Sequence, residues 1–217
     1  FEDADIPAAV AGLMLAKMRN GGAACTAANR VYVQKSIADQ FTKEFAQAMS
    51  QLKMGKGTEA GIQLGASVSI KERNKIAELV DAAVKAGGKL HTGGTTPEGA
   101  GAFYPATVIS VDKTNDILNH EVFGPDAPIV TFDTDTEAIQ LANSTDFGLI
   151  SYVFTKDLAR AIRTAEAIES GMVAINKGVI SDPAAPFGGV KQSGLGREGG
   201  FDGIHEFLET KYIGVEI

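Results

Sequence analysis

Strands and helices are expected to alternate along most of this 217-residue chain, and this alternation constrains its fold more than any other feature. Short apolar runs predict strands at residues 30–34, 104–111, 128–132, 150–154 and 172–175. Amphipathic segments predict helices after Asp5, after Ser36 and after Ser69, and at 136–143 and 158–168. Strands joined through helices of about ten residues form right-handed crossovers. We therefore expect an α/β fold with a mostly parallel sheet and flanking helices.

Three of the helix starts can be placed from capping side chains. Asp5 precedes a helix that has a proline in its first turn and stops at Asn20-Gly21-Gly22. Ser36 is expected to cap a second helix, whose apolar positions recur every three or four residues through Leu52. Ser69-Ile70-Lys71-Glu72 is a capping box and predicts the start of a third helix.

Charge and composition exclude several classes of protein. The 27 acidic residues outnumber the 20 basic ones, and no cluster of Lys and Arg offers a surface for nucleic acid. The longest apolar-leaning run, Pro7–Ala16, is too short to span a bilayer, and no basic region precedes it as in a signal peptide. The single cysteine excludes an internal disulfide and fits a reducing compartment, so we expect a cytoplasmic protein without membrane contacts.

Much of the glycine is gathered in segments that predict loops. Two of them are Gly55–Gly65 and Gly93–Gly101. A longer loop-like stretch, Gly178–Gly203, is of the length typical of functional or disordered segments. The final segment, Lys211–Ile217, alternates apolar and polar residues like an edge strand that lacks a partner.

Cys25 follows four small residues, Gly21-Gly22-Ala23-Ala24, and its surroundings allow two interpretations. A lone cysteine is commonly a small buried hydrophobe. The small neighbours, however, leave room around the sulfur and let backbone N–H groups point inward. A nucleophilic thiol that attacks a carbonyl requires both features.

Three motifs, in matching order and spacing, resemble the aldehyde dehydrogenase superfamily. The first surrounds Cys25, the second is Glu121-Val122-Phe123-Gly124-Pro125, and the third runs from Pro186 to Glu198. The resemblance covers essentially the whole chain and implies the catalytic half of that family. It implies a catalytic domain at residues 1–208 and, at 209–217, a C-terminal strand used to form a homo-oligomer.

The resemblance also implies a chemistry for individual residues. Cys25 as thiolate would add to an aldehyde carbon, and the backbone N–H of Cys25 would donate to the oxyanion. Hydride would pass to NAD or NADP, and a base-activated water would hydrolyse the thioester. Glu121, otherwise an exposed acid before a turn, would bind the nicotinamide ribose hydroxyls. Phe123, otherwise a core residue, would pack at the nicotinamide end of the cofactor.

The substrate is predicted from three further residues. Arg19, at the end of the first helix, could be a solvated cation favoured by the helix dipole. The branch of the family that oxidises succinate semialdehyde has an arginine here, which grips the distal carboxylate of the substrate. Ser181 resembles the hydroxyl that assists this arginine, and Phe187 would form an aromatic wall. A dehydrogenase for glutarate semialdehyde would share all three residues.

The chain also departs from the family pattern. It has Ala23 where the family usually has Gln or Glu. The family's general-base Glu, oxyanion-stabilising Asn and second substrate Arg would lie upstream of Phe1. We therefore expect an excised or truncated catalytic domain that is inactive alone. The alternatives are a non-catalytic folding or assembly module and a thiol esterase or acyl transferase that uses Cys25 without a nucleotide.

Two other patterns carry no function in this interpretation. Gly194-Leu195-Gly196-Arg197-Glu198-Gly199 satisfies G-x-G-x-x-G, but it follows a long loop and leads into more glycine, which indicates a structural turn. The three histidines have no ligand spacing, so no metal site is predicted.

Overall fold

The predicted alternation of strands and helices is confirmed in the computed structural model, which describes residues 1–217. The largest sheet has the order β1-β4-β3-β2 and comprises β1 (Val31–Gln34), β4 (Asp126–Phe132), β3 (Thr107–Ser110) and β2 (Lys89–Thr92). In this sheet β4 runs parallel to both β1 and β3, and only β2 is antiparallel to its neighbour.

Two smaller sheets complete the strands. A parallel pair joins β6 (Ile150–Val153) to β7 (Met172–Ile175). A short antiparallel pair joins β5 (Phe147–Gly148) to β8 (Val190–Lys191). The fold class is therefore α/β with mostly parallel strands, as expected.

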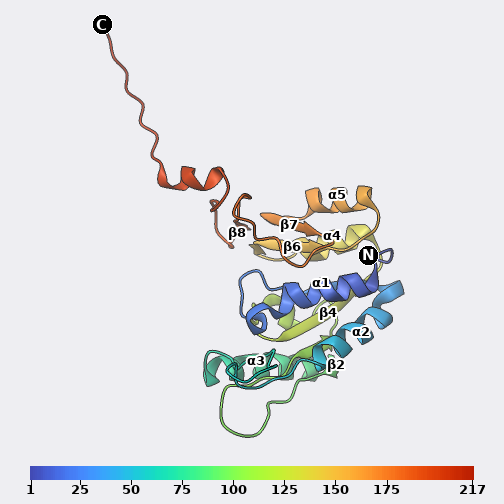
Figure 1. Ribbon diagram of the computed structural model, residues 1–217. Coiled ribbons are helices and arrows are strands. Elements are labelled where there is room, and N and C mark those ends of the chain that lie inside the picture. Colours follow the sequence, from blue (N-terminus) through green and yellow to red (C-terminus); the bar gives the residue numbers. More distant parts are fainter.

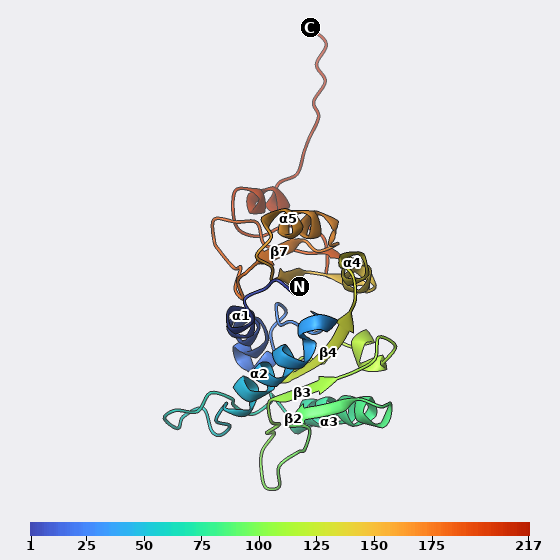
Figure 2. The ribbon, with the colours of Figure 1, turned by 90° about the vertical axis from the view of Figure 1, so that its right-hand side faces the viewer.

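Helices cover both faces of the larger sheet (Figures 1 and 2). The five α-helices are α1 (Ile6–Met18), α2 (Ala38–Ser50), α3 (Ile70–Lys85), α4 (Asp135–Asn143) and α5 (Leu158–Ala167). Short 3₁₀-helices lie at η1 (Arg19–Gly22), η2 (Lys35–Ile37), η3 (Asp116–Asn119) and η4 (Asp202–Phe207). None of the helices combines the length and apolar character needed to cross a membrane.

Alternate residues of the central strands serve two separate cores. On β3, Val108 packs in the core with α1 and α2, whereas Ile109 packs in the core with α3. On β4, Ile129 and Val130 divide in the same way. Successive side chains of a strand point to opposite faces, so a fully apolar strand is stable only where both faces are covered. This explains why these strands read as continuous apolar runs rather than as alternating ones.

The capping predictions are confirmed at two helices and wrong at one. The Asp5 carboxylate accepts the Ala8 N–H at 3.0 Å, and the Ser69 hydroxyl accepts the Glu72 N–H at 3.2 Å. Ser36 does not cap α2. It lies within η2, and its hydroxyl donates to the Glu2 carboxylate instead.

The strands β2, β5 and β8 were not predicted from the sequence, and the predicted C-terminal strand stays a prediction. The strand β2 was not predicted, because Lys89–Thr92 has a largely exposed, mixed polar surface and pairs at the sheet edge. Residues 209–217 form no strand in the single chain and extend away from the body (Figure 1). A strand needs a partner to satisfy its backbone groups, and this segment contacts none.

Asp3 ties the first residues of the chain to the start of α5. Its carboxylate accepts the N–H groups of Lys156 and Asp157, both at 2.9 Å, and the Thr155 hydroxyl. It also pairs with the Arg160 guanidinium at 2.8 Å. Burial opposes ionisation of Asp3, but these hydrogen bonds and the Arg160 charge outweigh it and lower the pKa of Asp3 to about 2.

We expect Asp3→Asn to lower the free energy of unfolding by about 1–2 kcal/mol at pH 7. A carboxyl whose pKa is lowered in the native state stabilises the fold above its ordinary pKa, and this contribution is lost as the pH falls toward 2. Urea unfolding between pH 7 and pH 3 should show the difference from wild type shrinking in acid. Asp112→Asn, at an exposed carboxylate with no side-chain partner, is the control. A pH-independent difference would contradict the assignment.

Candidate active site

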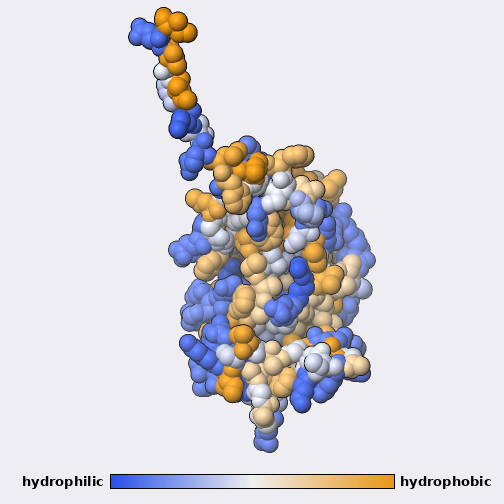
Figure 3. All heavy atoms as spheres, turned by 60° about the vertical axis from the view of Figure 1, so that its left-hand side comes forward, coloured by the Kyte–Doolittle hydropathy of each residue, from blue (hydrophilic) through white to orange (hydrophobic).

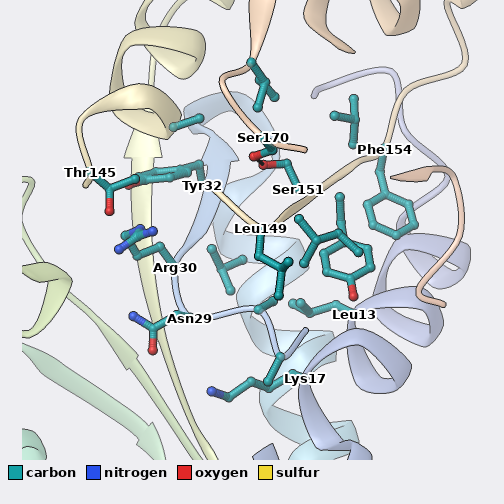
Figure 4. A pocket seen from close by; sticks show the side chains of 18 of the residues that line it. Leu13, Lys17, Asn29, Arg30, Tyr32, Thr145, Leu149, Ser151, Phe154 and Ser170 are labelled. Atoms are coloured by element: carbon teal, nitrogen blue, oxygen red, sulfur yellow. Dashed lines mark hydrogen bonds between the residues drawn. The ribbon is translucent and has the colours of Figure 1, made fainter. Parts of the chain in front are cut away.

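A cavity of about 450 Å³ lies between the edges of β1 and β6, beside the segment that carries Cys25. Its wall includes most of β1, all of β6 and one side of α1. Figure 4 shows Arg30 and Tyr32 entering from the β1 side and Leu149 and Ser151 from the opposite side. The lining is mainly apolar with a few polar groups, which is the usual character of a small-molecule site.

The local backbone explains how Cys25 reaches this cavity. After α1 the chain turns through η1, where Asn20 and Gly21 adopt left-handed φ values of 51° and 62°. Gly22 also has a positive φ, and a Cβ at this position would lie 2.0 Å from the carbonyl oxygen of Gly124. Only glycine allows this approach. The glycine pair therefore brings the Cys25 segment against the Gly124 backbone.

Cys25 itself is exposed and lines the cavity. The interpretation of this residue as a small buried hydrophobe is therefore wrong. The backbone N–H of Cys25 makes no hydrogen bond to another backbone group. This N–H is free to donate to an oxygen that develops next to the sulfur.

Glu121 and Phe123 line the same cavity as Cys25. Asn29 holds their segment in place: its amide donates to the His120 carbonyl at 2.6 Å and accepts the Val122 N–H at 3.1 Å. The Glu121 carboxylate is exposed and takes part in no ion pair. An exposed carboxylate without a partner can accept both hydroxyls of a ribose diol, so these residues fit a nicotinamide dinucleotide.

The other three predicted residues lie outside the cavity wall. Arg19 is exposed at the start of η1, although its charge acts on the nearby phenol of Tyr152. Ser181 is exposed in the segment after β7. Phe187 is half-buried and exchanges two backbone hydrogen bonds with Glu198, at 2.7 and 2.8 Å. The structure thus brings Cys25, Glu121 and Phe123 together but does not add the predicted substrate residues to them.

Residues 194–199 do not form a dinucleotide-binding turn. They follow the two-residue strand β8 and precede η4, with no crossover helix. They also lie outside the cavity. The interpretation of this G-x-G-x-x-G as a structural turn is confirmed.

The sequence analysis missed a pair of buried charged residues behind the Cys25 segment. Lys17 and Asp126 are both almost fully buried, and neither oxygen of Asp126 has a hydrogen-bond partner. Burial raises the pKa of Asp126, and the charge of Lys17 only partly opposes this rise. Burial likewise lowers the pKa of Lys17. Lys17 lies one turn from Leu13 on the apolar side of α1, a position where a lysine could have signalled a buried charge.

We expect the stability of Asp126→Asn, relative to wild type, to improve as the pH rises from 4 to 7. A carboxyl whose pKa is raised in the native state stabilises the fold below its ordinary pKa, and this contribution is lost as the pH rises. Asparagine keeps the shape but cannot ionise. Urea unfolding at both pH values measures the change, again with Asp112→Asn as control. A relative loss of stability toward pH 7 would instead identify Asp126 as an ion-paired carboxylate.

Comparison with known proteins gives a consistent result. The profile of the aldehyde dehydrogenase family matches residues 1–213. The chain is 53% identical to a succinate-semialdehyde dehydrogenase of Paenarthrobacter nicotinovorans, over 99% of this chain and 48% of that protein. It is 44% identical to a glutarate-semialdehyde dehydrogenase of Pseudomonas putida, over 100% of this chain and 45% of that protein.

A solved structure extends the likeness to the fold. An NADP-dependent enzyme of Escherichia coli superposes with a TM-score of 0.95 at 42% identity, over 98% of this chain and 44% of that one. The chain therefore spans about half the length of the relatives it matches.

Proposed function

The chain belongs to the aldehyde dehydrogenase family, and from this premise we propose that it is the catalytic half of an NAD(P)-dependent dehydrogenase for succinate semialdehyde. One observation carries the proposal: the exposed thiol of Cys25 shares a cavity with Glu121 and Phe123. A thiol with access to a docking aldehyde and a carboxylate able to bind a cofactor ribose are the two groups that this reaction requires.

Cys25 begins the proposed reaction. Its thiolate adds to the aldehyde carbon, and the free backbone N–H of Cys25 donates to the resulting oxyanion. A nicotinamide cofactor, when bound, would supply the hydride acceptor that the conversion of this adduct to a thioester requires. Sulfur suits this role because it attacks readily at neutral pH and leaves readily when water hydrolyses the thioester.

Glu121 and Phe123 orient the cofactor in this proposal. The carboxylate of Glu121 would accept hydrogen bonds from the ribose hydroxyls of a bound cofactor, and the Phe123 ring would supply an apolar surface at its nicotinamide end. The positive φ of Phe123, 57°, turns the backbone sharply at this point. A non-glycine residue rarely adopts such a conformation, and these outliers concentrate at ligand-binding sites.

Arg19 is the residue that we propose for recognition of the substrate carboxylate, with Ser181 assisting and Phe187 as an aromatic wall. Support comes from the exposed guanidinium of Arg19, whose charge acts on the phenol of Tyr152, a residue that lines the cavity. A guanidinium can pair in fork fashion with the carboxylate at the far end of a short semialdehyde. Glutarate semialdehyde is the second candidate, because a relative bears that name and the same residues would serve both substrates.

A reducing location follows from the same chemistry. Cys25 is exposed and is the only cysteine of the chain. Its thiol must remain reduced to act as nucleophile, so we propose that the protein works in the cytoplasm.

We expect Arg19→Met to lower the preference of Cys25 for a carboxylate-bearing reagent about three- to fivefold, since a charge pair near the surface contributes about 1 kcal/mol. The measurement compares alkylation rates of the single cysteine by iodoacetate and iodoacetamide, which are matched in size. Arg163→Met, which removes an exposed cation outside the cavity, is the control. An unchanged ratio in Arg19→Met would remove Arg19 from substrate recognition.

The C-terminal segment is proposed to join copies of the chain. Residues 209–217 protrude from the body, and Tyr212, Ile213 and Val215 are each more than 70% exposed. Apolar and polar residues follow one another along this tail (Figure 3). An exposed segment with this pattern is suited to add as a strand to the sheet of another copy.

We expect the wild-type chain to form a homo-oligomer and the double variant Ile213→Pro/Val215→Pro to be monomeric. Proline cannot donate a backbone hydrogen bond to a sheet ladder, whereas the length of the tail is preserved. Sedimentation at several protein concentrations measures the state. The matched variant Ile213→Thr/Val215→Thr keeps the backbone donors and should still associate. A wild-type chain that sediments as a monomer would contradict this role.

A further inference from the structure

One long-range hydrogen bond reaches the Cys25 turn from β6. The Tyr152 hydroxyl donates to the carbonyl of Thr26 at 2.8 Å, across 126 residues of sequence. Thr26 is 7% exposed, whereas the neighbouring Cys25 is exposed. Thr26 therefore anchors the turn to the protein interior, and Cys25 is the residue that the turn exposes.

The turn has few other restraints. The Ala27 N–H donates to the Ala24 carbonyl at 2.9 Å, and the Ala28 N–H donates to the Ala16 carbonyl of α1 at 3.2 Å. Tyr152 provides the only side-chain hydrogen bond to residues 24–28. Small residues bury little surface, so hydrogen bonds must define the conformation here.

Tyr152 also lies where the proposed chemistry takes place. It lines the cavity, and the charges of Arg19 and Cys25 both act on its phenol. Burial raises the pKa of Tyr152, so its hydroxyl keeps the proton that it donates.

We propose that Tyr152 is a positioning residue for Cys25: its hydroxyl fixes the Thr26 carbonyl and thereby the turn that sets the thiol and its backbone N–H toward a docked aldehyde. This inference rests on the proposed addition of Cys25 to an aldehyde. In that step a bond forms between Sγ and the aldehyde carbon, and the carbonyl π pair moves to oxygen. The thiol proton ends on that oxygen, so the product is a hemithioacetal and no oxidant is consumed.

The chain contains a matched control for this tyrosine. Tyr32, on β1, lines the same cavity and donates to the Leu141 carbonyl at 3.1 Å. It is half-buried like Tyr152, and burial raises its pKa as well. Its partner lies in α4, however, rather than in the turn that carries Cys25. Tyr152→Phe and Tyr32→Phe each remove one hydroxyl bonded to one carbonyl.

The experiment measures three properties of both variants. Succinate semialdehyde labelled with ¹³C at its aldehyde carbon reports the hemithioacetal equilibrium by NMR. Iodoacetamide alkylation reports exposure of the thiol. Amide hydrogen exchange at Ala27 and Ala28 reports opening of the turn.

We expect Tyr152→Phe to lower the hemithioacetal equilibrium constant about three- to tenfold, which corresponds to the loss of one hydrogen bond. The alkylation rate should stay within about twofold of the wild-type rate, because exposure of the thiol does not depend on the hydrogen bond between Tyr152 and Thr26. Amide hydrogen exchange at Ala27 and Ala28 should accelerate. Tyr32→Phe should leave all three measurements unchanged. If both tyrosine hydroxyls had a purely structural role, both variants would melt at a lower temperature, and the loss of hemithioacetal and the faster exchange would not be confined to Tyr152→Phe.

Two outcomes overturn the inference: an equal loss of adduct in both tyrosine variants, or unchanged exchange at Ala27 and Ala28 in Tyr152→Phe. Absence of adduct even in wild type would contradict the proposed function instead. In that case the exchange measurement alone still decides whether Tyr152 holds the turn.

Discussion

The arrangement of the site depends on the contact between two backbones, at Gly22 and Gly124. A Cβ at position 22 would meet the Gly124 carbonyl oxygen at 2.0 Å, so no other residue can take this place without moving one of the two segments. The contact holds the segment before β1 against the segment before β4. Because one carries Cys25 and the other Glu121, the distance between thiol and carboxylate is set by main-chain packing rather than by the flexible side chains themselves.

The sheet explains why these two segments meet. β1 and β4 are parallel neighbours, with Val31 opposite Ile129, so the amino ends of both strands lie at the same end of the sheet. Cys25 and Glu121 both precede their strands, which places the site at the amino ends of β1 and β4. Ligands of open α/β sheets usually bind at the carboxyl ends. The departure is physically reasonable here, because the glycines of η1 and of residues 121–125 supply the close backbone approach that the site needs.

Local signals predicted most of the fold, and long-range contacts account for what was missed. Asp5, Ser69 and the strand at 172–175 carry their information within a few residues, and the structure has them as predicted. Cys25, Glu121 and Phe123 were singled out because short motifs around them resemble the aldehyde dehydrogenase superfamily, and they share one cavity, while their roles stay predictions. The bond from Tyr152 to Thr26 was not predictable, since only folding brings β6 to the turn. Ser36 was mispredicted because a tertiary partner, Glu2, competes for its hydroxyl.

The end of α1 raises an electrostatic problem that its own basic residues can solve. The carboxyl end of a helix carries partial negative charge, and from the end of α1 the chain passes through η1 into the turn with Cys25. A thiolate or an oxyanion formed there would be disfavoured unless cations lie close by. Lys17 and Arg19 occupy the last turn of α1 and the residue after the helix. Lys17 is buried and its charge acts on Asp126, whereas Arg19 remains exposed. Lys17 is thus sequestered in the core with Asp126, and Arg19 is the basic residue at this end of α1 that stays open to solvent.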